Sequence, residues 1–123
     1  MYVTSHVQGI HHVGLLVDDL DATLPFYTEV LGIPRNRDRP DFAVRGAWLD
    51  LNDRQQLHVF EGPTPADGGQ HVALQVTDLD GLIERLTSLG VKVRGFPREG
   101  PFTQAVVFDP AGNRVELYAG PSA

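Results

Sequence analysis

The chain has 123 residues, of which 41% are hydrophobic and 21% charged, a size and composition typical of one globular domain. Its formal net charge of -6 at pH 7 argues against nucleic acid or an anionic membrane surface as a partner. The absence of cysteine excludes disulfides, thiolate metal sites and a cysteine nucleophile. With no signal peptide and no apolar run long enough to cross a bilayer, we expect a cytoplasmic protein.

The first half of the chain predicts a strand, a helix and then further strands. Residues 9–17 alternate as a half-buried strand does, and the Asp18–Asp21 segment offers helix N-caps. A helix should run from there to Leu31 and stop at Gly32, with Pro25 in its first turn. After a polar connection, strands are expected at 41–44, 46–51 and 56–60.

The second half repeats this order after a linker rich in proline and glycine, residues 61–70. Residues 12–21 and 71–80 are identical at seven of ten aligned positions. The same patterns predict a strand at 71–76, a helix at 81–89 capped by Asp80 or Asp78, and strands near 91–94, 103–108 and 114–118. We therefore expect one domain, 1–123, made of two strand–helix–strand–strand–strand modules at about 9–61 and 70–119.

The repeat duplicates a histidine together with the strand that holds it. His12 and His71 begin the first strands of the modules, while His58 and Glu116 occupy equivalent positions on the last strands. Imidazole nitrogens and a carboxylate are suitable ligands for a divalent cation. A lone histidine in a strand is more often structural, and His11, which alternation turns away from the face of His12, is assigned that role. Four matched candidates favour one metal site, formed where two sheets pack edge to edge.

Period-two alternation also predicts which residues share the face of the metal ligands. Two small residues, Gly14 and Ala73, follow the strand histidines by two positions and leave space above the metal. The candidates for contacting a substrate on this face are Trp48, Phe60, Gln75, Phe108, Arg114 and Tyr118. The aromatic members indicate a small-molecule substrate with an apolar portion. For each of these residues taken alone, ordinary core packing is an equally good explanation.

Together these segments resemble the vicinal oxygen chelate superfamily, which contains glyoxalase I, extradiol dioxygenases and bleomycin-resistance proteins. The resemblance covers about Gly9 to Tyr118. It is carried by Ile10-His11-His12-Val13, by Phe26-Tyr27-Thr28-Glu29-Val30-Leu31-Gly32, by His71-Val72-Ala73-Leu74 and by the closing Asp109-Pro110-Ala111-Gly112-Asn113-Arg114-Val115-Glu116-Leu117. It implies an α+β, glyoxalase-like fold in which two pseudo-symmetric βαβββ modules form a cup-shaped, eight-stranded mixed sheet.

The same resemblance implies that His12, His71 and Glu116 are metal ligands, with His58 at the fourth ligand position. Glyoxalase I has a glutamate at that position, so here Glu116 alone remains as the candidate catalytic base. The implied cofactor is one divalent metal ion, and zinc, nickel, cobalt, manganese and ferrous iron all suit three imidazoles and a carboxylate. Members of the superfamily usually pair, so we expect a homodimer, and the sequence leaves open whether each site forms within one chain or across two.

Three functions follow from the resemblance. The favoured one is a metal-dependent, glyoxalase-like isomerase or lyase that holds a small substrate through vicinal oxygens and stabilises an enolate or oxyanion. The alternative is a non-catalytic dimer that binds a small molecule or antibiotic, as bleomycin-resistance proteins do. The third is a ferrous extradiol-type dioxygenase, although that class has a tyrosine where this chain has Val106, and a histidine that this chain lacks after His71.

Overall fold

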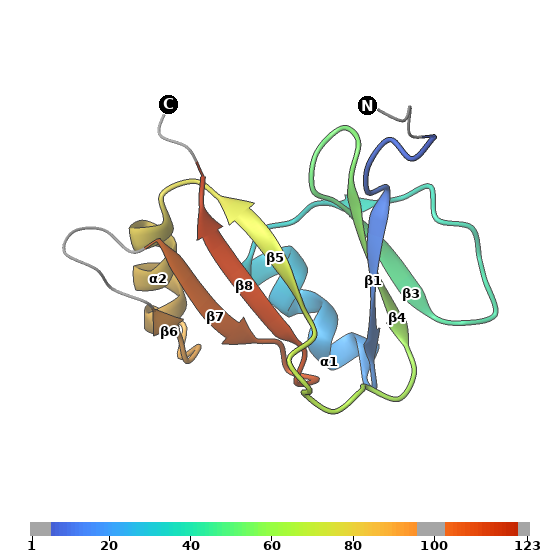
Figure 1. Ribbon diagram of the computed structural model, residues 1–123. Coiled ribbons are helices and arrows are strands. Elements are labelled where there is room, and N and C mark those ends of the chain that lie inside the picture. Colours follow the sequence, from blue (N-terminus) through green and yellow to red (C-terminus); the bar gives the residue numbers. More distant parts are fainter. Residues whose placement is uncertain (1–5, 96–102, 121–123) are drawn as a thin grey trace.

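The computed structural model describes residues 6–95 and 103–120, in which eight strands form two four-stranded mixed sheets (Figure 1). The first sheet has the order β1-β4-β3-β2 and the second the order β5-β8-β7-β6. In each sheet the first and last strands of the module pair in parallel and the other neighbours are antiparallel. The α+β fold with two βαβββ modules is therefore confirmed. The strand bounds are β1 His12–Val17, β2 Arg35–Asn36, β3 Gly46–Asp50, β4 Gln56–Glu61, β5 His71–Val76, β6 Arg94–Gly95, β7 Gln104–Phe108 and β8 Arg114–Ala119.

Each module carries its helical segment directly after its first strand. The first module has α1 (Leu20–Pro25) followed by the π-helical η1 (Phe26–Val30), and the second has α2 (Leu79–Ser88). The carboxylate of Asp19 caps α1 and that of Asp78 caps α2, each by accepting a backbone N–H at 3.1 Å. Gly32 and Gly90 follow the two helical segments with φ of 71° and 81°, the left-handed conformation that the predicted helix stops require.

None of the helices in the described residues is long and apolar enough to cross a membrane.

The first module differs from expectation in two places. Pro25 ends α1 instead of lying in its first turn. The chain continues in the wider turn of η1, where Leu31 N donates to Phe26 O at 2.9 Å. Residues 41–44 form a loop and no strand, since the Arg39 guanidinium donates to Val44 O at 2.8 Å across it. The edge strand of the sheet is instead β2, within the segment expected to be a connection.

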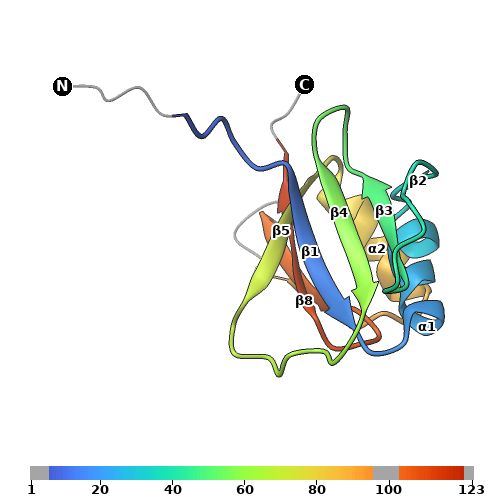
Figure 2. The same ribbon diagram turned by 90° about the vertical axis from the view of Figure 1, so that its right-hand side faces the viewer.

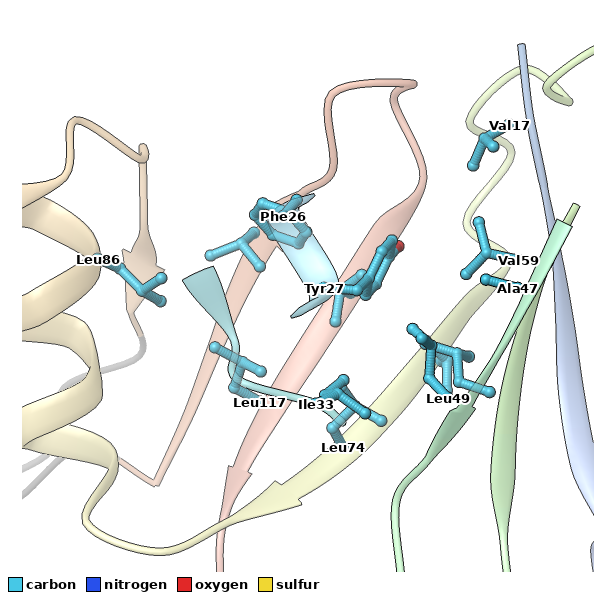
Figure 3. Packing of buried hydrophobic residues seen from close by; sticks show 14 of the residues in the cluster. Val17, Phe26, Tyr27, Ile33, Ala47, Leu49, Val59, Leu74, Leu86 and Leu117 are labelled. Carbon is cyan, nitrogen blue, oxygen red and sulfur yellow. The ribbon is translucent and has the colours of Figure 1, made fainter. Parts of the chain in front are cut away.

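One hydrophobic core joins the two sheets (Figure 3). Each sheet contributes one face to it, which we call the core face, with fully or nearly buried residues Val17, Leu49, Leu57 and Val59 from the first sheet and Leu74, Val107, Val115 and Leu117 from the second. Phe26 and Tyr27 of η1 lie between the sheets (Figure 3), and Figure 2 shows β1, β4 and β3 side by side in the first of them. The opposite faces, which we call the ligand faces, carry the predicted metal ligands, as the alternation predicts.

A buried polar network fixes the first module against the second. The Tyr27 hydroxyl donates to Asp109 Oδ2 at 2.6 Å, and the other oxygen of this carboxylate accepts the backbone N–H groups of Ala111 and Asn113, each at 2.9 Å. The Asn113 side chain donates to Leu16 O at 2.9 Å as well as to Asp109 Oδ2 at 3.0 Å. Burial, followed by the adjacent carboxylate, raises the pKa of Tyr27 well above its usual value, so the phenol stays a donor.

We expect Tyr27→Phe to lower the free energy of unfolding by about 1.5–3 kcal/mol, because it removes a buried hydrogen bond to a charged acceptor. Urea unfolding followed by circular dichroism measures the change. Tyr118→Phe is the matched control, since that ring is 41% exposed, and it should stay within about 0.5 kcal/mol of wild type. Equal effects of the two substitutions would contradict the structural role assigned to Tyr27.

Candidate metal centre

His12 and His58 form a pair on the ligand face of the first sheet, which we call the first half-site. Their rings are stacked, with centroids 3.9 Å apart and planes only 12° from parallel. Partial burial of His58, followed by the positive charge that His12, His11 and Arg39 can carry, lowers the pKa of His58 to about 4. The His58 imidazole is therefore neutral at pH 7 and keeps a nitrogen lone pair, which is the form that a metal ion requires.

A relay of polar side chains fixes the tautomer of His58. Gln56 Nε2 donates to Asp50 Oδ1 at 3.1 Å, and Asp50 also accepts from the amide of Asn36 at 3.1 and 3.3 Å. Because a carboxylate can only accept, the amide nitrogen of Gln56 must face Asp50, so its oxygen faces His58 Nε2 at 2.8 Å. His58 Nε2 therefore carries the proton, and Nδ1 is the nitrogen available to a ligand.

His71 and Glu116 form the second half-site, on the ligand face of the second sheet. His71 Nδ1 lies 2.7 Å from Gly69 O, which can only accept, so Nδ1 carries a proton. His71 Nε2 lies 2.5 Å from Glu116 Oε2, and the glutamate side chain is mostly buried, with 14% of its surface exposed. This is a hydrogen-bond distance, and both atoms belong to the ligand types that divalent metals bind once the bridging proton has left. The donors of this half-site thus suit a divalent metal.

Strand register shows that the half-sites are equivalent. His58 is the Cα partner of Gly14, two residues after His12, and Glu116 is the Cα partner of Ala73, two residues after His71. The predicted equivalence of His58 and Glu116 is therefore confirmed by the pairing of the strands.

The structure does not bring the two half-sites together within one chain. In residues 6–95 and 103–120, no three His, Asp or Glu side chains are grouped so that they could hold one metal ion. Both core faces meet at the shared core, so each ligand face points away from it. The four residues expected at a single centre are thus divided into two pairs, each with two candidate ligands.

The candidate substrate-contacting residues are also divided between the two ligand faces. Trp48 and Phe60 are half-buried in the first sheet, whereas Gln75, Phe108 and Tyr118 are exposed on the second. Arg114 is already engaged: its guanidinium makes two hydrogen bonds to the Asp67 carboxylate, at 2.9 and 3.3 Å, and these hold the pKa of Asp67 below its usual value. Arg114 is therefore fixed against the linker between the modules, which weakens its assignment as a substrate ligand.

Three residues near the first half-site were not anticipated. Gln56 lies two positions before His58, and period two could have placed it on the same face. Phe42 reaches the site from a loop, where no periodic pattern applies. His11 Nδ1 lies 2.9 Å from His12 Nδ1, although alternation was expected to separate the two rings. Because β1 begins only at His12, the alternation of the strand does not extend to His11.

Residues 9–117 match the family model of the Glyoxalase/Bleomycin resistance protein/Dioxygenase superfamily. A lactoylglutathione lyase of Arabidopsis thaliana is 34% identical over 119 residues, which are 86% of this chain and 42% of that longer protein. The antibiotic-binding protein TnmS3 from Streptomyces sp. CB03234 is 25% identical, with a TM-score of 0.77 over 96% of this chain and all of its own.

The fold has a further match in a Bacillus anthracis protein described as a glyoxalase family member. It superimposes with a TM-score of 0.78 and 23% identity, over 97% of this chain and the whole of the other. At this identity the likeness concerns the fold alone, and it agrees with the two mixed sheets and two helical segments described above.

The lowered pKa of His58 predicts a pH dependence of stability in metal-free protein. The pKa is about 4 in the folded chain and near the ordinary 6.5 in the unfolded chain. As the pH falls from 6.5 to 4, the unfolded chain takes up a proton at His58 that the folded chain does not. The free energy of unfolding therefore decreases across this window, and below pH 4 His58 causes no further decrease. We expect His58→Gln to lose less stability than wild type over this range, measured by urea unfolding in chelator. Parallel pH profiles would contradict this account of His58.

Proposed function

Because the chain belongs to the glyoxalase/bleomycin resistance protein/dioxygenase superfamily, we propose that it is a metal-dependent, glyoxalase-like enzyme of the isomerase or lyase type. Its substrate is a small molecule bound through vicinal oxygens. The observation that carries the proposal is the pair of equivalent half-sites, each with two suitable donors on a ligand face. The sequence similarity to a lactoylglutathione lyase supports the same chemistry.

The complete site is proposed to form between two copies of the chain. In an isologous dimer, the first half-site of one subunit faces the second half-site of its partner, and the twofold axis repeats the arrangement. His12 and His58 from one subunit then join His71 and Glu116 from the other. This pairing also covers the large apolar side chains that a single chain leaves exposed on the second ligand face, Phe108 at 47% and Tyr118 at 41%.

These four residues would hold one divalent ion, which when bound stabilises negative charge on a substrate oxygen. Glu116 is the candidate general base, since a carboxylate placed at the substrate can take a proton from the carbon beside a carbonyl. Gln104 Nε2 lies 3.5 Å from Glu116 Oε1 and orients the carboxylate, whereas His71 Nε2, which lies against Oε2, is assigned to the metal ion. His58 supplies no second base at the equivalent position. Its low pKa and its hydrogen bond to Gln56 suit it to the role of an uncharged metal ligand.

The alternative is a dimer that binds a small molecule without catalysis. The similarity to an antibiotic-binding protein supports this alternative. The two functions differ in their need for metal. Protein purified without chelator, then offered zinc, nickel, manganese or ferrous iron, should take up one ion per chain if the enzyme proposal holds. Failure of wild type to retain any of these ions would favour the binding function.

A complementation experiment tests the composite site. One variant combines His12→Ala with His58→Ala, and the other combines His71→Ala with Glu116→Ala. Each variant alone should bind no metal. A heterodimer of the two, isolated through different affinity tags, should bind about half the metal of wild type, since one of its two sites unites both intact half-sites while the other has none.

The control is the fold of each double variant, checked by circular dichroism, because His58 and Glu116 are partly buried and their removal can affect packing. Metal-free heterodimers formed from two folded variants would contradict a site shared between subunits. Metal retained by either variant alone would contradict the assignment of these four ligands.

A further inference from the structure

A hollow of about 410 Å³ lies beside the first half-site, on the ligand face of the first sheet. Apart from the two imidazoles and Arg39, its lining is apolar, and His12, Gly14, Phe42, Trp48, His58 and Phe60 contribute to it. The volume falls in the lower part of the range of about 300–1,000 Å³ in which proteins bind small ligands. The hollow therefore has the size and surface of a small-molecule subsite, and two candidate metal ligands form part of its wall.

The aromatic side chains of this hollow form a continuous row that ends at the half-site. The centroid of the Phe42 ring lies 6.2 Å from that of Trp48, Trp48 is stacked on His58 at 4.8 Å, and His58 is stacked on His12 at 3.9 Å. The Trp48 and His58 planes are only 12° from parallel, as are the His58 and His12 planes. Because these three rings are stacked on one another, their faces are in mutual contact and their edges are left for a ligand. Ring edges bind the face of an aromatic ring in the edge-to-face arrangement.

The wall that Phe42 provides is held in place. The Arg39 guanidinium lies 4.9 Å from the centroid of the Phe42 ring and donates to Val44 O at 2.8 Å, which closes the loop around the aromatic side chain. A Cβ atom on Gly46 would lie 2.9 Å from Arg39 Nη2 and 2.7 Å from Val59 O, so glycine is needed where the loop rejoins β3. Phe42 is 51% exposed, and the Arg39 guanidinium lies over its ring.

We infer that this hollow binds a flat, aromatic group of the substrate, bonded to the carbon whose oxygen atom reaches the half-site. The substrate class is thus an aryl-substituted compound with vicinal oxygens, such as an aryl 2-oxo acid or aldehyde. The inference rests on the proposed function and deepens it. We assign the hollow to a small ligand and not to a side chain of the second subunit, because two residues of its wall, His12 and His58, are candidate metal ligands.

The test compares two ligands that differ only by the ring. Phenylglyoxylate and pyruvate carry the same 2-oxo acid group, and each is titrated into the full chain, loaded with zinc and metal-free, by calorimetry. The quenching of Trp48, the one tryptophan of the chain, gives a second readout. We expect phenylglyoxylate to bind at least tenfold more tightly than pyruvate and to change the Trp48 emission. Equal affinity for the two acids in both forms would overturn the inference.

Variants locate the ring. Phe42→Ala should weaken phenylglyoxylate binding at least fivefold and leave pyruvate binding within twofold, and Trp48→Leu should weaken phenylglyoxylate binding at least as much. Leu89→Ala, which removes a 53% exposed apolar side chain just after α2, is the matched control and should change neither. Because Phe42 is exposed, its variant keeps the test valid if Trp48→Leu fails to fold. Phe42→Ala that weakens dimerisation while leaving phenylglyoxylate binding intact would show that the partner subunit fills the hollow, and would overturn the inference.

The two proposals fail in different ways. Metal uptake without preference for the ring overturns the aromatic subsite and leaves the metal site standing. Preference for the ring, lost in Phe42→Ala, without any metal uptake supports the subsite and overturns the metal-dependent function.

Discussion

The arrangement of this molecule depends on the buried hydrogen bond between Tyr27 and Asp109. It joins η1 of the first module to the turn before β8 of the second, and Asn113 extends the connection to the backbone of β1. A buried carboxylate must have its hydrogen bonds satisfied, and here two side chains and two backbone N–H groups do so. Since these partners come from both modules, the network sets how the two sheets face each other.

This constraint explains why four candidate ligands do not meet in one chain. With η1 and the core faces of both sheets enclosed in one core, the ligand faces are left on the outside of the molecule. Each face then presents two donors, too few for the four-coordinate site that imidazole and carboxylate ligands commonly form. The proposed metal site therefore needs a partner for each half-site, and a second copy of the chain would supply both.

The sequence predicted the local structure well, because local structure depends on patterns that a single chain displays. Alternation placed His58 and Glu116 on the ligand faces of their sheets. The parallel pairing of β1 with β4 and of β5 with β8 confirms that the two positions are equivalent. The packing of modules was not predictable in this way: no periodic signal links Tyr27 to Asp109, which lie 82 positions apart. The relay through Gln56 and the position of Phe42 depend on the same long-range geometry, and loops such as 41–44 carry no period at all.

The two half-sites lie at equivalent strand positions and differ in their side chains. This difference bears on the kind of substrate that they would hold. Beside the first, a neutral His58 continues a row of aromatic rings along an apolar hollow. Beside the second, Glu116 brings a carboxylate, and its neighbours on the same face include Gln75 and the ion pair of Arg114 with Asp67. A ligand between the two half-sites avoids burying unpaired polar groups only if its apolar part lies beside His58 and its polar atoms lie beside Glu116. The proposed site would therefore favour an asymmetric substrate, whose polar atoms meet Glu116 and whose apolar part meets the hollow beside His58.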